Sequence, residues 1–402
     1  MISVQEAERI ILEHATLLPT APCPLASAHG RILREAIAAD RDQPPYDRIT
    51  MDGIAFAFRA LEQGMRSFHI EAIHPAGQTA PALKDAAAGC LQVMTGAILP
   101  TGCDCIVPFE EIDVTDDTAT LKSDCRPKLM QYVHRQGTDR RAGEMLLAAG
   151  CMLRSPEIGM AAAAGYAQVT VSGPLTATVI SNGDELVELS SPIQPYQVRR
   201  SNTYAMRAAL VTLGLQEVQC IHTPDDPAAM EHELKKALAH NGVIILSGGV
   251  SMGKYDYVPA ALERLSVKPL FHKVLQKPGK PLWFGLGPAG QTVFALPGNP
   301  VSSLVCFHRY VVPYLRQRMG APAKETARVF PGERITPHAD LTLFIPVRLR
   351  QADDGRPVAT PVPYHGSGDL SSLGQTDGFI ELAPASVACE TTTLVPFHPW
   401  SC

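Results

Sequence analysis

The centre of the chain carries the segment ILSGGVSMGKYD at residues 245–256. An apolar run, Val243 to Leu246, passes there into a glycine-rich turn with two serine hydroxyls and a closing aspartate, and a helical pattern of apolar residues starts at about Val258. A strand, a glycine turn and a helix in this order are typical of phosphate binding, because the free N–H groups of the turn and of the helix start can meet the anion. The segment matches neither standard nucleotide-binding fingerprint, so taken alone it could equally be a structural turn.

A second turn of the same kind lies earlier in the chain. Residues 179–186 read VISNGDEL and follow another apolar run, 175–180. Its polar residues and glycine are Asn182, Gly183, Asp184 and Glu185. Two turns that end strands and carry acidic and hydroxyl groups predict one crevice at the carboxyl edge of a parallel sheet, where open α/β sheets bind ligands.

The region from 174 to 321 alternates between strand and helix patterns, which predicts a three-layer α/β domain. The expected strands are 177–180, 218–221 and 243–246, the expected helices are 204–213, 228–239 and 301–319, and a hairpin is expected at 273–285. We expect Ser201 and Asn202 to cap the first helix. The Asp-Asp-Pro of 225–227 should start the second, so Asp225 could serve only as a helix cap.

Three further parts are expected around this domain. Residues 46–139 show short apolar alternations among many Gly, Pro, Asp and Thr residues, which predicts a small β-rich domain. This domain interrupts an N-terminal domain made of 1–45 and 140–173, in which 30–37 is expected to be a helix or a strand. Strand patterns predict a C-terminal β domain at 322–402. The predicted fold class is therefore multidomain, α/β plus β.

Composition limits the classes of partner. The chain has 402 residues, a formal net charge of −5 and 19% charged residues, so no dominant basic surface points to nucleic acid. Glu6, Glu8 and Glu13 interrupt any apolar run at the N-terminus, so we expect no signal peptide. No stretch approaches the ~20 apolar residues of a membrane span, so no membrane partner is expected. Cys103 and Cys105, which a strand would place on one face, are expected to be buried thiols rather than a zinc site. We therefore expect a cytoplasmic protein.

Four other short motifs stand out. KPGKP (277–281) places two lysines around a tight turn, and LPGNPVS (296–302) runs from a strand pattern into a helix start. TMDG (50–53) and MTGA (94–97) lie in the small β-rich domain. Singly, KPGKP is more often a surface turn than an anion site, and PGNP is more often only a helix start. The motifs therefore indicate a function only as a set.

Taken together and in this order, the motifs resemble those of the molybdenum insertase family, the bacterial molybdopterin molybdotransferases related to the insertase domain of gephyrin. The resemblance runs from about residue 4 to residue 395. It implies an elongated subunit of four parts that forms a homodimer through its N-terminal domain. It also implies an enzyme that inserts molybdate into adenylylated molybdopterin (molybdopterin-AMP) and releases AMP and molybdenum cofactor. Transient contacts with molybdopterin adenylyltransferase and with recipient molybdoenzymes are implied as well.

The resemblance gives roles to residues of suitable chemistry. Phosphates need hydrogen-bond donors, an Mg²⁺ ion that bridges phosphates needs hard oxygen ligands, and dianionic molybdate needs positive charge. The implied cofactor-binding residues are Asn182, Gly183, Ser247, Gly248, Gly249, Ser251, Lys277, Lys280, Pro297, Gly298 and Ser367, and the two lysines would hold molybdate. The implied metal ligands are Asp184, Glu185, Asp225 and Asp256. The implied catalytic residues are Asp52, Thr95, Asp139 and Asp256.

At some positions the chain departs from the family pattern. His134 and Gln136 stand where the family has arginines, and Gly242 replaces an acidic residue. Pro346 aligns with a C-terminal arginine that holds molybdate, and Arg348 would point to the same face of a strand. These replacements leave a second hypothesis, a catalytically weakened paralogue that carries molybdopterin or molybdenum cofactor for a partner enzyme. The retained acidic residues and lysines favour the enzyme.

Overall fold

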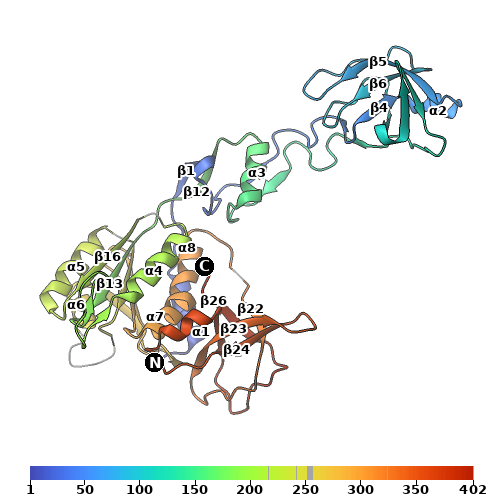
Figure 1. The fold of residues 1–402 in the computed structure, drawn as a ribbon. Coiled ribbons are helices and arrows are strands. Elements are labelled where there is room, and N and C mark those ends of the chain that lie inside the picture. Colours follow the sequence, from blue (N-terminus) through green and yellow to red (C-terminus); the bar gives the residue numbers. More distant parts are fainter. Residues whose placement is uncertain (216, 241, 251–256, 324, 402) are drawn as a thin grey trace. The chain divides into compact units, whose positions relative to one another are not determined.

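The computed structural model describes residues 1–402 except 216, 241, 251–256, 324 and 402. The chain divides into two compact units, which we call the main unit and the inserted unit (Figure 1). The main unit consists of Met1–Glu35, Ala149–Ser155 and Gln168–Cys402, and the inserted unit of Ala36–Ala148 and Pro156–Ala167. Each unit has its own apolar core.

A six-stranded sheet forms the centre of the main unit, in the order β16-β13-β17-β21-β20-β18. The first four strands are parallel, and β20 and β18 continue the sheet antiparallel. The strands are β13 (Thr176–Asn182), β16 (Glu217–Thr223), β17 (Val243–Ser247), β18 (Lys268–His272), β20 (Trp283–Leu286) and β21 (Thr292–Leu296). The three strands predicted by apolar runs are confirmed. The hairpin expected at 273–285 is formed by β18 and β20, so its first strand lies before the expected range.

Helices cover both faces of this sheet, so the domain has the three layers that the alternating pattern predicted (Figure 1). On β17, Ile245 packs with helix residues of one layer, and Ile244 packs with those of the other. Burial on both faces explains why β17 is apolar from Val243 to Leu246. One layer holds α1 (Val4–Glu13), α4 (Ser201–Thr212), α7 (Pro300–Cys306) and α8 (Val312–Arg318), and the other holds α5 (Pro227–His240) and α6 (Val258–Arg264).

The long helix predicted at 301–319 contains a π-helical segment, η3 (Phe307–Val311), between α7 and α8. Apolar spacing alone does not reveal this wider turn, because Phe307, Tyr310 and Val311 continue the apolar pattern and all five residues of the segment are buried. π-helical segments are rare in proteins, but those that occur often lie at functional sites.

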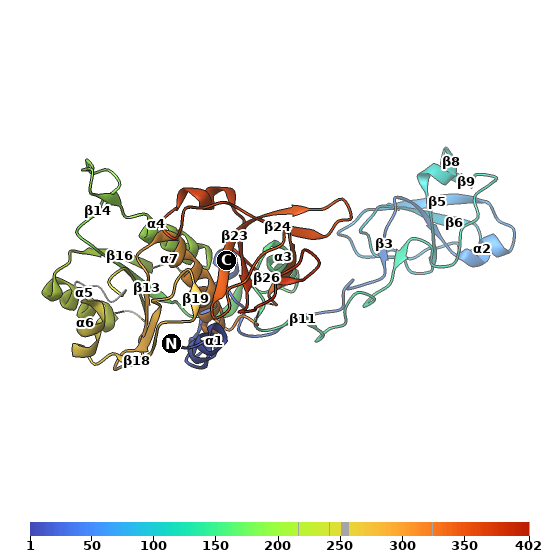
Figure 2. The same cartoon turned by 90° about the horizontal axis from the view of Figure 1, so that it is seen from below.

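A second sheet of the main unit has the order β19-β23-β24-β22-β26-β25, and β25 also pairs with β23, so the sheet closes on itself. Figure 2 shows most of it in orange and red. Its strands are β19 (Gln276–Lys277), β22 (Ala327–Pro331), β23 (Thr342–Gln351), β24 (Pro357–Pro361), β25 (Gly378–Leu382) and β26 (Val395–Pro399). β19 leads directly into KPGKP, so the lysine turn is attached to the C-terminal sheet.

The remaining elements of the main unit are short. They are β1 (Thr20–Pro24), which pairs with β12 (Gln168–Ser172), the pair β14 (Leu186–Val187) and β15 (Val198–Arg199), and the 3₁₀ turns η1 (Leu25–Ser27) and η4 (Ser371–Gln375). The segment 30–37, expected to be a helix or a strand, makes only isolated bridges, Ile32 with Met152 and Leu33 with Val171, before β2 begins at Ile37.

The inserted unit is β-rich, as its composition predicted (Figures 1 and 2). Its six-stranded sheet has the order β7-β4-β6-β5-β9-β8. The strands are β4 (Gly53–Phe56), β5 (Ser67–His74), β6 (Gly89–Val93), β7 (Cys105–Pro108), β8 (Ile112–Thr115) and β9 (Thr118–Leu121). Its other elements are β2 (Ile37–Ala38), β3 (Arg48–Ile49), α2 (Phe58–Glu62), η2 (Phe109–Glu111), β10 (Val133–His134), β11 (Met145–Leu147) and α3 (Ser155–Ala163), whose first residue belongs to the main unit.

Cys103 and Cys105 are buried but pack in separate apolar clusters, because β7 begins only at Cys105. Burial raises the pKa of each thiol to about 12. Within the part of the chain that the structure describes, no helix is both long enough and apolar enough to cross a bilayer.

A cleft at the carboxyl edge of the central sheet

A cleft of about 1010 Å³ lies in the main unit where β13, β16, β17 and β21 end. Parallel strands present their carboxyl ends at one edge, so turns far apart in sequence meet there. Of the residues predicted to bind cofactor or metal, those lining the cleft are Asn182, Gly183, Glu185, Asp225, Ser247, Gly248, Gly249, Lys277, Lys280, Pro297, Gly298 and Ser367. Ser251 and Asp256 lie outside the described residues.

The glycine turn after β17 depends on residues without a side chain. Gly248 and Gly249 have φ angles of +103° and +72°, which L side chains rarely adopt. A Cβ atom on Gly249 would lie 2.6 Å from the side chain of Val258 at the start of α6. The turn therefore brings backbone rather than side chains to the floor of the cleft.

The turns after β13 and β16 are joined by hydrogen bonds. Asn182 Nδ2 donates to Asp225 Oδ1 at 2.7 Å, and the Asp225 backbone N–H donates to Asp184 Oδ1 at 3.0 Å. The helix that follows is capped by Asp226, whose Oδ1 accepts from Ala229 N–H at 2.7 Å. Asp225 is thus not the cap of α5, and its carboxylate lines the cleft.

The predicted metal ligands are placed differently from one another. Glu185 and Asp225 line the cleft, while Asp184 is exposed and joined to the backbone of Asp225. Among the described residues, no three His, Cys, Asp or Glu side chains are grouped so that they could hold a metal ion. Side chains of the described residues therefore do not form a complete cage, and an ion here would need further oxygen ligands.

The lysine turn places both of its charges at the cleft. Lys277 and Lys280 are exposed, and within the described residues neither has an ion-pair partner. Gly279 between them has φ +93° and lies against buried side chains, because a Cβ there would be 2.5 Å from Cys306 Sγ. Two unpaired cations on a tightly packed turn form a site suited to a dianion.

Asn202 contributes to the cleft in a way that sequence reasoning missed. Ser201 and Asn202 were expected to cap α4, which is wrong: Arg200 is the N-cap and makes no side-chain capping bond. Asn202 Nδ2 instead donates to Ser247 Oγ at 2.9 Å and to the Gly298 carbonyl at 2.8 Å. It therefore links the ends of two strands, which local spacing cannot reveal.

Arg200 is a second residue that the sequence did not single out. Its side chain is 7% exposed, lines the cleft, donates from Nε to Ser181 Oγ at 3.1 Å and pairs with Glu188. The C-terminal domain reaches the cleft through Ser367, whose Oγ accepts from Asn299 Nδ2 at 2.7 Å. Ser367 is thereby attached to the start of α7.

Pro346, the residue expected to replace a molybdate-holding arginine in the C-terminal domain, lies outside the cleft. Pro346 is buried in β23 opposite Phe379, and Arg348 on the same strand is exposed. Neither residue lines the cleft. Arg348 is therefore not positioned in this structure as a substitute for a cleft arginine.

The other predicted catalytic residues belong to the inserted unit. Asp52 accepts hydrogen bonds from the Thr95 backbone N–H at 2.6 Å and from Thr95 Oγ1 at 2.7 Å. The hydroxyl bond and then the backbone bond hold the pKa of Asp52 below its ordinary value, so the carboxylate stays ionised at neutral pH. Asp139 bonds His134 Nε2 at 2.9 Å, and His134 Nδ1 lies 3.2 Å from Arg48 Nη2.

Profiles of known families match nearly the whole chain. Residues 2–165 match the MoeA N-terminal region (domain I and II), 178–317 match a probable molybdopterin binding domain, and 331–400 match the MoeA C-terminal region (domain IV). Two solved structures of molybdopterin biosynthesis MoeA proteins from Pyrococcus horikoshii are similar. One has a TM-score of 0.82 at 25% identity over 99% of this chain and 100% of that chain, and the other 0.80 at 24% identity over all of both chains. The predicted fold class is confirmed.

Curated relatives are similar along the same length. A molybdopterin molybdenumtransferase of Synechocystis sp. is 37% identical over all of both chains. One of Nostoc sp. is 32% identical over 89% of this chain and 84% of its own, and molybdopterin molybdenumtransferase 2 of Mycobacterium tuberculosis is 33% identical over 80% and 81%. The family predicted from the motifs is confirmed, and the chain belongs to the molybdopterin molybdenumtransferases.

Proposed function

We propose that this protein is a molybdopterin molybdenumtransferase, which inserts molybdate into adenylylated molybdopterin, forms molybdenum cofactor and releases AMP. One observation carries the proposal: a single cleft gathers the glycine turn, the acidic turns and both lysines of KPGKP. The names of relatives at 31–37% identity support it and do not favour the carrier hypothesis.

The glycine turn and its neighbours bind the phosphate end of the pterin in this proposal. The Gly248 N–H already donates to the Leu296 carbonyl at 3.0 Å, so the backbone N–H groups that follow it in the turn would donate to phosphate oxygens. Ser247, Pro297 and Gly298 shape the adjoining wall, which Asn202 holds together. The phosphate end of the pterin would thus be held largely by backbone N–H groups and neutral side chains rather than by charged side chains.

A magnesium ion is the second part of the proposal. Glu185 and Asp225 offer hard oxygen atoms at the cleft, which suit Mg²⁺. Asp184 or Asp256 and phosphate oxygens would complete the coordination shell of the ion, since Mg²⁺ commonly binds through one or two carboxylates and a substrate phosphate. When bound, the ion would neutralise charge on the phosphates, while the protein carboxylates position it.

Molybdate is the third part. Lys277 and Lys280 supply two positive charges, and Ser367 supplies a hydroxyl at the same cleft. The resemblance places Pro346 where the family has an arginine that holds molybdate, so one charge-assisted contact would be absent, which would weaken binding about ten- to a hundredfold. Molybdenum itself would end on the soft dithiolene sulfurs of the pterin.

We further propose that the chain works as a homodimer with four domains, 1–45 with 140–173, 46–139, 174–321 and 322–402. The first would carry the dimer contacts, and Asp52, Thr95 and Asp139 of the second would take part in catalysis. Transient partners would be molybdopterin adenylyltransferase and the recipient molybdoenzyme. Sedimentation at working concentration tests the dimer, and a monomer at every concentration would exclude it.

The decisive assay combines purified protein, adenylylated molybdopterin, Mg²⁺ and a molybdate series. AMP release and cofactor formation should rise together with molybdate. The variant Lys277→Ala/Lys280→Ala should lose this dependence. Tight binding of molybdopterin without any AMP release would instead establish the carrier, and an unchanged molybdate response of the lysine variant would remove KPGKP from the site.

A further inference from the structure

We propose that Gln276 and Tyr310 are positioning residues for the lysine turn, and that they set how well the protein captures its oxyanion. The inference deepens the proposed function and rests on it, since the oxyanion is the molybdate held by Lys277 and Lys280. Neither residue need contact the substrate. Both would act through the turn that carries the two lysines.

Gln276 contacts the backbone of the lysine turn from the buried side. It is 1% exposed, directly precedes Lys277, and its Nε2 donates to the Gly279 carbonyl at 3.0 Å and lies 3.3 Å from Cys306 Sγ. The amide therefore links Gly279, in the middle of the turn, to the residue directly before the turn. The same carbonyl also accepts from Cys306 Sγ at 3.6 Å, and the Lys280 carbonyl accepts from the Val274 N–H at 2.9 Å, so Gln276 is one of several contacts that hold the turn backbone.

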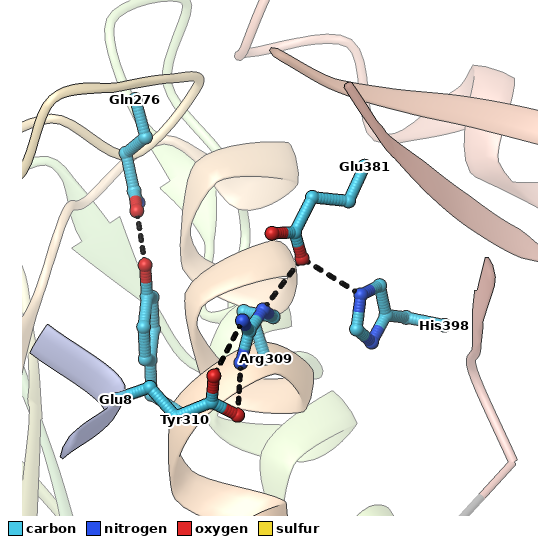
Figure 3. A network of polar contacts seen from close by, with 6 residues as sticks. All are labelled: Glu8, Gln276, Arg309, Tyr310, Glu381 and His398. Atoms are coloured by element: carbon cyan, nitrogen blue, oxygen red, sulfur yellow. Dashed lines mark hydrogen bonds and ion pairs between the residues drawn. The ribbon is translucent and has the colours of Figure 1, made fainter. Parts of the chain in front are cut away.

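Tyr310 orients the amide of Gln276. Its hydroxyl donates to Gln276 Oε1, so the oxygen of the amide faces Tyr310 (Figure 3). The amide nitrogen faces the Gly279 carbonyl. The opposite rotamer would place the amide nitrogen against the tyrosine and the oxygen against a carbonyl, which can only accept. Tyr310 is 1% exposed, and burial raises the pKa of its hydroxyl, so it remains a donor.

The π-helical segment η3 supplies both Tyr310 and the arginine that precedes it. Arg309 and Tyr310 are consecutive residues of η3, yet they serve different partners (Figure 3). Arg309 lies between Glu8 of α1 and Glu381 of β25, with bonds of 2.8 and 2.9 Å to the first and 2.8 Å to the second. His398 of β26 bonds Glu381 at 2.9 Å.

This ionic network anchors Tyr310 to the C-terminal sheet. Arg309 is 6% exposed and its guanidinium lies over the Tyr310 ring, 5.4 Å from the centroid. The same sheet holds the start of the turn, because β19 pairs with β23 and the Thr342 N–H donates to the Leu275 carbonyl at 3.0 Å. Tyr310 and the start of the lysine turn are thus both attached to the C-terminal sheet.

The physical consequence is preorganisation of charge. Two long lysine side chains lose rotamer entropy when they converge on one anion, and a mobile backbone would add to that cost. A turn held by Gln276 keeps the two Cα positions constant before the anion arrives. Loosening it should weaken anion capture but leave the chemical step, once molybdate is bound, as fast as before.

The test measures the molybdate concentration that gives half-maximal cofactor formation. Gln276→Met keeps the volume and removes the contacts with Gly279, Cys306 and Tyr310, and Tyr310→Phe removes only the hydroxyl. We expect each to raise the half-maximal concentration about five- to thirtyfold, the effect of losing about one buried hydrogen bond. The rate at saturating molybdate and the KM for adenylylated molybdopterin should stay within about twofold.

Tyr314→Phe is the matched control. Tyr314 is also 1% exposed and its hydroxyl also bonds a buried side chain, Thr292, but it does not touch the turn. General loss of stability would lower the active fraction and hence the rate, not the half-maximal concentration. Equal shifts in Tyr310→Phe and Tyr314→Phe would overturn the proposal.

A double variant tests whether Tyr310 acts through Gln276. Gln276→Met/Tyr310→Phe should have the same half-maximal molybdate concentration as Gln276→Met alone. Fully additive effects of the two substitutions would show that Tyr310 does not act through Gln276. Amide hydrogen exchange of Gly279, Lys280, Leu282 and Trp283 should be faster in both single variants but not in Tyr314→Phe.

Failure of the function and failure of the inference look different. A parent protein without molybdate dependence refutes the proposed function, and the positioning role is then refuted by unchanged exchange or supported by faster exchange. The inference alone is refuted if the parent protein depends on molybdate through its two lysines while Gln276→Met and Tyr310→Phe leave the half-maximal molybdate concentration unchanged.

Discussion

Asn182 and Asp225 close the ends of two neighbouring parallel strands with one hydrogen bond of 2.7 Å between Nδ2 and Oδ1. Asn182 is itself oriented by Thr223, whose Oγ1 donates to its Oδ1 at 3.2 Å. Within the described residues, the second carboxylate oxygen of Asp225 accepts no hydrogen bond. Asp225 therefore combines a structural contact with an oxygen atom that can face a cation in the cleft.

Asp225→Asn separates these two roles. The amide oxygen can still accept from Asn182, so the free energy of unfolding should change by less than about 1 kcal/mol. The negative charge is lost, so the Mg²⁺ concentration for half-maximal AMP release should rise about tenfold or more. An Mg²⁺ titration of AMP release checks this, and an unshifted titration would remove Asp225 from the metal site.

Asp226→Ala is the reciprocal variant at the next position. Asp226 caps α5 through the Ala229 N–H, so its loss should lower the free energy of unfolding by about 0.5 to 2 kcal/mol. The Mg²⁺ titration should be unchanged. Both tryptophans, Trp283 and Trp400, lie in the main unit, so urea unfolding followed by their fluorescence measures this unit. A shifted Mg²⁺ response would show that the cap and the site are coupled.

His308 should make the main unit sensitive to mild acid. Burial lowers the pKa of His308 to about 4 from 6.5, and the charge of His398 acts in the same direction. The unfolded chain binds the proton first, so stability falls as pH drops from about 6.5 to about 4, by roughly 2 to 3 kcal/mol. His308→Phe keeps the edge contacts with Phe307 and Trp400 and should flatten this part of the urea midpoint profile.

Arg309→Met should be strongly destabilising. It leaves Glu381, 9% exposed, with His398 as its remaining described partner, and removing one member of a buried pair costs about 3 to 5 kcal/mol. Burial acts to raise the pKa of Glu381, but the His398 bond and the Arg309 charge outweigh it and hold the pKa below its ordinary value. Arg309→Met/Glu381→Gln should recover part of the loss at pH 7, and recovery of nothing would show that packing dominates.

Asp52 tests whether two copies share a site. Asp52 and Thr95 are distant in sequence from the cleft residues and form their own hydrogen-bonded pair in the inserted unit. If one subunit completes the site of another, subunits with Asp52→Ala mixed with subunits with Lys277→Ala/Lys280→Ala should regain part of the AMP release. Each variant alone should stay inactive. A mixture as inactive as its components, with heterodimers verified, would place the whole site in one subunit.

Local chemistry allowed the sequence to predict the walls of the cleft. An apolar run followed by glycines or by Asn-Gly-Asp ends a strand, because Gly248 and Gly249 must adopt positive φ angles and a side chain there would collide with its neighbours. The alternation of strands and helices then forces those ends to one edge of a parallel sheet. For the same reason the residue types of KPGKP and PGNP are enough to assign both segments to turns.

The tertiary structure alone decided which side chains hold those turns in place. Asn202 reads as a helix cap but bridges two strand ends, and Asp226 rather than Asp225 caps α5. Gln276 and Tyr310 are separated by 34 residues, so no local pattern could pair them. Local propensity acts over a few residues, whereas these hydrogen bonds depend on packing of segments that meet only when both sheets have formed.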